Sequence, residues 1–264
     1  MTLESPLGTA TQGSTEQLPT PERGGANIGV VAIDGFRWAG VSTVSQDLAT
    51  LVAQRTGNQP TLLSYDSEYA RLREDALSTI GIKSEEDIHR EVDRRIASQM
   101  MDPANKGKVL IIEGSRMPFV ARQLEREAKD SRLALQEGQP ASILTLPEGT
   151  PFPAKIVTAF IYADTEARYE RKYKGQPSEW RNHAKRQYEL ERIEEANLQS
   201  FWMAYPNFTG ENPASISFNV AGRPVYDLFY DSTNHTSMDI ALKIFESNHF
   251  KNQILPVVTQ NQTV

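Results

Sequence analysis

The chain has 264 residues, contains no cysteine and carries a formal net charge of −6 at pH 7. The lack of cysteine excludes disulfide bonds and thiolate metal sites, and it fits a reducing compartment, so we expect a cytoplasmic protein. The acidic balance argues against a nucleic-acid partner, and the absence of any apolar run near the ~20 residues of a bilayer span argues against a membrane protein.

The first elements alternate between apolar runs and amphipathic stretches. Residues 1–26 are rich in Thr, Gly, Pro, Ser and Gln and predict a disordered tail. A buried strand is expected at 28–33, followed by a helix over about 41–56 whose apolar residues recur at helical spacing. A short strand at 61–64 leads into a polar, charged helix over 68–77.

The central part of the chain continues this alternation. An acidic helix start predicts a helix over 84–101, and the run KVLIIE predicts a buried parallel strand over 108–113. A helix is expected over 119–129. Residues 130–154 are rich in Pro and Gly and predict an irregular insertion, and the apolar run IVTAFIYA at 156–163 predicts another buried strand.

The last part contains a basic helix, a strand and a final helix. The basic helix follows Asp164 and ends before the sequence GQPS, after which a long helix is expected to about residue 204. A strand at 226–230 and a helix from 237 follow, and we expect 251–264 to be a loosely attached tail. Alternating strands and helices predict an α/β fold with a mostly parallel sheet and helices on both faces.

The loop between the first strand and the first helix has the spacing of a phosphate-binding loop. Gly35 and Gly40 bound it, and the hydroxyl residues Ser42 and Thr43 open the helix. In such a loop the backbone amides from Gly40 to Thr43 bind phosphates and Ser42 ligates Mg²⁺. Val41 stands where a lysine is expected. The alternative is a tight strand–helix turn with incidental glycines.

Two departures concern the interior of this loop. Arg37 lies inside it and could supply the charge that Val41 lacks, while the bulky Trp38 could obstruct or reshape the phosphate site. Our expected nucleotide site therefore includes Arg37 and Val41 together with Gly35, Gly40, Ser42 and Thr43, and it does not include Trp38.

Three polar residues follow the ends of other predicted strands, where ligands bind in open α/β sheets. Arg71 and Arg116 could hold a phosphate through their forked guanidinium groups, and Asp66 could bind a base or sugar. The alternatives are a solvated charged helix around Arg71 and an ordinary turn before Arg116.

Basic residues gather in the predicted helices after residue 164. Arg168 and Arg171 belong to the first of these helices, and Arg192 belongs to the second. A hinged pair of basic helices could close over a transferring phosphoryl group as a lid. The alternative is a solvated face paired with the glutamates of the second helix.

Together these segments resemble the cytidylate kinase-like group of P-loop nucleoside-monophosphate kinases. The resemblance rests on IGVVAIDGFRWAGVSTVSQDLATLVAQRTG, VLIIEGSRMPF, FIYADTEARYERKYKGQPSE, ERIEEANLQSFWMAYPNF and YDLFYDSTNHTSMDIALKIFE. It implies a P-loop NTPase-type three-layer α/β/α domain over 27–250 with a five-stranded sheet and a helical lid at about 165–195. It also implies phosphoryl transfer from ATP, with Mg²⁺, to a (deoxy)cytidine monophosphate-like acceptor.

The resemblance also implies a role for each candidate residue. The loop from Gly35 to Thr43 would hold the donor phosphates, Arg71 and Arg116 the acceptor phosphate, and Arg168, Arg171 and Arg192 would act from the lid. The loss of the loop lysine leaves a second interpretation open, a kinase-derived pseudoenzyme that binds a nucleotide or a protein without transferring phosphate. A different P-loop activity on a small molecule is the third.

Overall fold

The fold places the strand that leads into the glycine-bounded loop at the centre of one parallel sheet. The computed structural model describes residues 28–78, 84–114, 116–129, 152–174, 185–192, 195, 219–220 and 223–259. The strands are β1 (Ile28–Gly35), β2 (Thr61–Ser64), β3 (Val109–Glu113), β4 (Ala154–Tyr162), β5 (Asn219–Val220), β6 (Arg223–Pro224) and β7 (Leu228–Asp231). The helices are α1 (Val41–Thr56), α2 (Tyr65–Ser78), α3 (Glu85–Met101), η1 (Pro103–Asn105), α4 (Met117–Lys129), α5 (Thr165–Lys172), α7 (Ser237–Glu246), α8 (Asn248–Gln253) and α9 (Leu255–Thr259).

The main sheet has the strand order β2-β3-β1-β4-β7, and every pairing in it is parallel. β1 is the central strand, with Val31 opposite Ile111 on one side and Val157 on the other. Both faces of the sheet are covered, so its inner strands are continuous apolar runs rather than alternating ones. β5 and β6 form a separate antiparallel pair.

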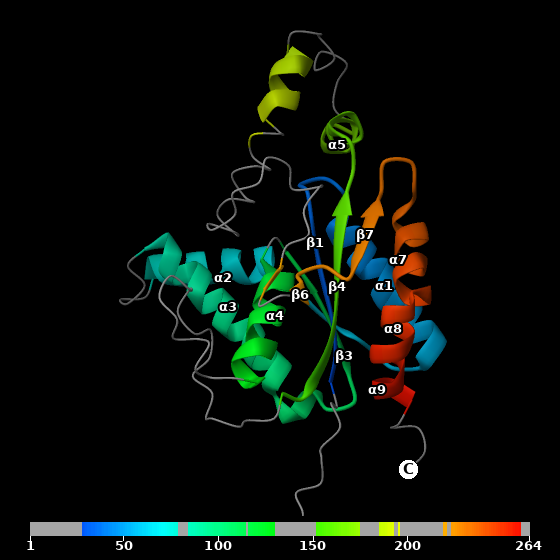
Figure 1. The fold of residues 1–264 in the computed structure, drawn as a ribbon. Helices are drawn as coiled ribbons and strands as arrows, with labels where there is room; N and C mark the ends of the chain where they lie inside the picture. Colours follow the sequence, from blue (N-terminus) through cyan, green and yellow to red (C-terminus); the bar gives the residue numbers. More distant parts are fainter. Residues whose placement is uncertain are drawn as a thin grey trace, which may run out of the picture.

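Helices cover the two faces of the sheet in separate groups (Figure 1). Because side chains alternate along a strand, Val31 and Ile33 pack with α1, α7, α8 and α9, while Val30 and Ala32 pack with α2, α3 and α4. The three layers confirm the predicted α/β fold with its five-stranded sheet. Figure 1 also shows α5 beyond the carboxyl end of β4, close to the point where the loop after β1 lies.

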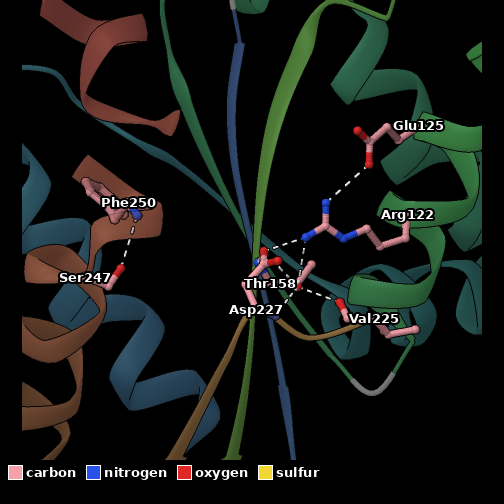
Figure 2. Close-up of polar contacts among 7 residues, drawn as sticks. All are labelled: Arg122, Glu125, Thr158, Val225, Asp227, Ser247 and Phe250. Carbon is pink, nitrogen blue, oxygen red and sulfur yellow. Dashed lines mark hydrogen bonds and ion pairs between the residues drawn. The ribbon is translucent and has the colours of Figure 1, made fainter. Parts of the chain in front are cut away.

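A partly buried ion pair fastens the segment before β7 to the sheet (Figure 2). Arg122 of α4 contacts Asp227 at 2.5 Å, and the same carboxylate oxygen accepts a hydrogen bond from the Thr158 amide at 2.9 Å. The Thr158 hydroxyl donates to the Val225 carbonyl at 2.6 Å. These contacts fix the edge strand β7 against β4, and β7 in turn leads to Ser232, which reaches the loop after β1.

The end of the chain differs from the expectation of a loose tail beginning at residue 251. α8 and α9 continue to Thr259, and the buried side chains of Ile254, Val257 and Val258 pack onto the sheet. If Gly29 of β1 carried a Cβ, that atom would lie 3.1 Å from a methyl carbon of Ile254. The lack of a side chain at Gly29 therefore leaves room for Ile254 to pack against β1. Apolar burial against β1, which short-range periodicity does not reveal, holds it in place.

Several expectations concern residues outside the described ranges. They include the disordered tail at 1–26, most of the insertion at 130–154, and residues 175–184 of the proposed lid. Residues 152–154 of the predicted insertion are described, and Ala154 is already the first residue of β4, so this strand begins two residues before the predicted start at Ile156. Within the described residues, every helix is too short or too polar to cross a bilayer.

Candidate functional site

The loop between β1 and α1 exposes the amino end of a long helix. Gly40 is the N-cap of α1 with φ +96°, and its lack of a side chain leaves the first amides of the helix uncapped. A Cβ placed on Gly40 would meet no atom within 4 Å. Ser42 and Thr43 are exposed in the first turn. Uncapped amides and exposed hydroxyls at a helix N-terminus are the donors that an anion needs.

The start of the loop is tightly packed. A Cβ on Gly35 would lie only 2.2 Å from the carbonyl oxygen of Ile161, so this position requires glycine. The Phe36 amide donates to the same carbonyl at 3.2 Å. The buried Asp34 carboxylate accepts hydrogen bonds from the Gly35 amide at 2.6 Å and from the Tyr226 hydroxyl at 2.8 Å. These contacts fix the direction in which the loop leaves the sheet.

Arg171 binds the backbone of the loop from α5. One guanidinium nitrogen lies 3.1 Å from the Ala39 carbonyl and 3.5 Å from the Trp38 carbonyl. Arg171 also donates to the hydroxyl of Ser232 at 3.0 Å and to the carbonyl of that residue. The Ser232 hydroxyl donates to the Ala39 carbonyl at 2.7 Å. Arg171 and the residue following β7 therefore clamp the loop in one conformation.

Lys172 brings a positive charge beside the same loop. Its ammonium lies 4.9 Å from the centre of the Trp38 ring and 3.0 Å from a Glu189 carboxylate oxygen. Trp38 has φ +61°, which turns the loop backbone at this residue. Burial alone would lower the pKa of Lys172, but its contacts with Tyr173 and Glu189 outweigh burial and raise that pKa. Lys172 is therefore charged at neutral pH.

The other two arginines expected in the lid occupy different surroundings. Arg168 is buried, with its guanidinium 4.9 Å from the centre of the Phe36 ring and 3.0 Å from the Thr165 hydroxyl. Arg192 lies in the helical residues 185–192 and is 60% exposed, with Glu189 at 3.5 Å. The structure thus brings Arg168 and Arg171 to the loop, whereas the contact of Arg192 is with a neighbour on its own helix.

The residues expected to bind the acceptor lie on α2 and just before α4. Arg71 is 55% exposed on α2 and pairs with Glu68 at 2.6 Å, and Asp66 is exposed on the first turn of α2. Arg116, just before α4, pairs with the buried Asp93 of α3 at 2.8 Å. Both arginines that we expect to hold an acceptor phosphate therefore have carboxylate partners. Arg37 of the loop is exposed.

Arg116 belongs to a polar cluster that the sequence analysis does not single out. We call the following residues the Asp93 cluster: Tyr65, His89, Asp93 and Arg116. Tyr65 begins α2 beside Gly114, and its hydroxyl lies against Nδ1 of His89. His89 and Asp93 lie four residues apart on α3, the spacing that puts two side chains on one helix face. That spacing is the signal in the sequence that could have identified them.

Burial shifts the pKa values of this cluster. It raises the pKa of Asp93 to about 6, against the opposing charge of Arg116, and it raises the pKa of Tyr65. Burial, and then the charge of Arg116, lower the pKa of His89. At neutral pH His89 is therefore uncharged, and Tyr65 keeps its proton. Perturbed groups of this kind gather at functional sites more often than elsewhere.

Metal binding by the protein alone has no support in the described part of the chain. Within it, no three side chains of the His, Asp or Glu type come together as a possible metal site. Any Mg²⁺ at the loop would need oxygen ligands from a bound phosphate besides the hydroxyl of Ser42, which is the usual way in which Mg²⁺ binds with nucleotides.

Comparison with known proteins gives fold-level likeness only. No protein-family model matches the chain, and no curated protein matches it. The chain is similar to an unliganded sugar kinase from Janibacter sp. (14% identity, 86% of this chain and 96% of that chain, TM-score 0.45). It is also similar to APS kinase from Mycobacterium tuberculosis in complex with AMPPNP and APS (13% identity, 83% and 96%, TM-score 0.44). A shikimate kinase from Acinetobacter baumannii in complex with shikimate shows 14% identity over 90% of this chain and 97% of that chain, with a TM-score of 0.41. Likenesses of this size do not establish a family, an activity or a substrate.

Proposed function

We propose that this protein is a phosphotransferase of the P-loop kinase type, which takes a phosphoryl group from ATP and transfers it to a small acceptor. The observation that carries the proposal is the contact between the β1–α1 loop and the basic helix α5. Arg171 bonds the loop carbonyls, and the ammonium of Lys172 lies against Trp38 of the loop. A phosphate loop at the central strand with positive charge beside it is the minimum that phosphoryl transfer requires.

The described residues fit a bound triphosphate at the loop. The open space beyond Gly40 and the uncapped amides of α1 suit the phosphates, and the exposed Ser42 hydroxyl suits Mg²⁺. When bound, ATP supplies the phosphoryl group, and Mg²⁺ neutralises part of its charge. Arg171 engages the loop carbonyls of Trp38 and Ala39 by hydrogen bonds, and Lys172 would supply positive charge that Val41 lacks.

The acceptor needs a separate argument. The sequence resemblance implies a (deoxy)cytidine monophosphate-like acceptor held by Arg71 and Arg116. Both arginines already pair with carboxylates, so the proposal names ATP as the phosphoryl donor and does not name the acceptor. Cytidine monophosphate is one of the acceptors to be tested.

One observation favours the second candidate, a pseudoenzyme that binds a nucleotide without transferring phosphate. Val41 carries no charge, and its side chain packs against Gly35, with a methyl carbon 2.8 Å from the place of a Cβ there. Positive charge comes instead from α5, where Lys172 is already paired with Glu189. In that case the site would bind ATP but stabilise the transition state poorly.

The test combines ATP binding with ADP formation, using the full chain and two variants of Val41. Val41→Lys adds the missing charge, and Val41→Met adds similar length without charge. We expect the wild type to bind Mg-ATP, and the lysine variant, but not the methionine variant, to bind about tenfold more tightly, which is ~1.4 kcal/mol. Failure of both the wild type and Val41→Lys to bind ATP would overturn the proposal. Binding without ADP formation over the acceptor panel would favour the pseudoenzyme.

A further inference from the structure

The Asp93 cluster lies at the carboxyl end of the sheet, between α2, α3 and the start of α4. Tyr65 begins α2, which follows β2 directly, and His89 and Asp93 lie on α3. Arg116 lies between the end of β3 and the start of α4. Figure 1 shows α2, α3 and α4 grouped on one side of the sheet, on the face opposite α1 and α7. The carboxyl ends of the strands are where ligands bind in open α/β sheets.

The ion pair in this cluster is incompletely formed. A terminal nitrogen of Arg116 lies 2.8 Å from Oδ2 of Asp93. The other carboxylate oxygen, Oδ1 of Asp93, and Nε of Arg116 are buried and have no hydrogen-bond partner among the described residues. A carboxylate and a guanidinium that fit each other often form two parallel hydrogen bonds. Here one donor and one acceptor remain unsatisfied, which is unfavourable for buried groups.

The surroundings of Asp93 also oppose its charged form. Its side chain is 8% exposed, and burial raises its pKa to about 6 although the charge of Arg116 acts in the opposite direction. Burial therefore disfavours the carboxylate more than Arg116 stabilises it. An ion pair of this kind contributes little to stability. Asp93 thus occupies Arg116 without binding it tightly.

Arg116 is accessible to a soluble anion. Its side chain is 26% exposed, and its Nε is a further donor. Nε2 of the neighbouring His89 is also buried without a partner in the described part of the chain. Burial, and then the charge of Arg116, lower the pKa of His89, so the imidazole responds to the charge on this guanidinium. A phosphate or sulfate group has several acceptor oxygens, and it can therefore bond more than one nitrogen of an arginine.

The charges of the cluster cancel at neutral pH. Arg116 is positive and Asp93 is mostly ionised, while His89 is uncharged and Tyr65 keeps its proton. An anion that approaches Arg116 therefore meets the negative charge of Asp93 beside it. If that charge is removed, the cluster has a net charge of about +1 and attracts the anion.

We propose that Asp93 is an internal competitor for Arg116, and that a phosphate or sulfate group binds this arginine by displacing the carboxylate. The contact is autoinhibitory, because a group occupies Arg116 only if it binds the guanidinium more strongly than Asp93 does. Where the anion is the phosphate of a phosphoryl acceptor, this inference rests on the proposed kinase function. For an inorganic anion it does not.

The test follows sulfate binding to the full chain at pH 7.5 without ATP, at constant ionic strength. The probe is the ring resonance of His89 in NMR spectra, which is one of four histidine signals and is assigned with His89→Gln. Asp93→Asn and Asp93→Ala both remove the competing charge. We expect each to lower the sulfate concentration that gives half of the shift at least about tenfold. Equal midpoints in the wild type and both variants would overturn the proposal, and a second variant keeps the test valid if one misfolds.

Two controls connect the gain to Arg116. Glu74→Gln removes one negative charge from an exposed residue of α2 and should leave the midpoint unchanged. Arg116→Gln in the Asp93→Asn background should abolish the sulfate-dependent shift of His89. A gain of the same size in Glu74→Gln, or one that persists without Arg116, would refute the competition. A protein that shows the gain but forms no ADP with any acceptor would refute the kinase proposal alone.

Discussion

Replacing Gly114 with alanine should strongly destabilise the protein, because two independent obstacles meet at this residue. A Cβ there would lie 2.4 Å from Cβ of Tyr65, and the backbone φ of +134° is one that residues with a side chain rarely adopt. Tyr65 is buried at the β2–α2 junction and has little room to move. Backbone strain of about 2 kcal/mol and overpacking of about 2 kcal/mol together predict a loss of about 4 kcal/mol.

The matched control is Gly40→Ala, which separates the two obstacles. Gly40 also has a positive φ, of +96°, but a Cβ there would meet no atom within 4 Å. It should therefore lose only the backbone contribution, about 1–2 kcal/mol. In urea denaturation followed by circular dichroism, a slope of about 3 kcal/mol/M puts the midpoint of Gly114→Ala roughly 1.3 M lower and that of Gly40→Ala roughly 0.5 M lower. Equal shifts for the two variants would refute the steric contact with Tyr65.

Two further predictions concern buried charges. The pKa of Asp93 in the folded protein, about 6, lies above its ordinary value of 3.8, so the folded state binds this proton more tightly than the unfolded state, and stability falls as pH rises from about 4 to 6. Relative to Asp93→Asn, the wild type should lose roughly 2.5 kcal/mol between pH 4 and pH 7 in urea titrations, and a difference that is constant with pH would contradict this cause. Asp227→Ala leaves the nearly buried Arg122 without its main partner and should lose about 3–5 kcal/mol in the same assay. Arg94→Ala, which breaks an exposed ion pair, should lose less than about 1 kcal/mol, and a similar loss in both variants would refute the structural role of Asp227.

Local sequence was sufficient for the elements that form the frame of the molecule. The run from Val109 to Ile112 is apolar because β3 is covered on both faces, and the strand ends at the predicted residue, Glu113. The side chain of Ser84 caps α3 by accepting from the Asp87 amide, and Gly57 ends α1 with φ +68°. Each of these features depends on residues within one or two turns, so its chemistry can be read from neighbours in the chain.

The sequence by itself also determined the nucleotide-loop hypothesis, because the spacing from Gly35 to Ser42 and the flanking elements are contiguous. It could not determine what the charged residues do. Arg171 reaches the Ala39 carbonyl across 132 positions of sequence, and Arg116 pairs with Asp93 from a different helix. Only the packing of α3 and α4 against β3 brings this arginine into an ion pair with a carboxylate of the protein. An arginine in a sequence shows that a charge is present, whereas its partner depends on which distant elements the fold brings together.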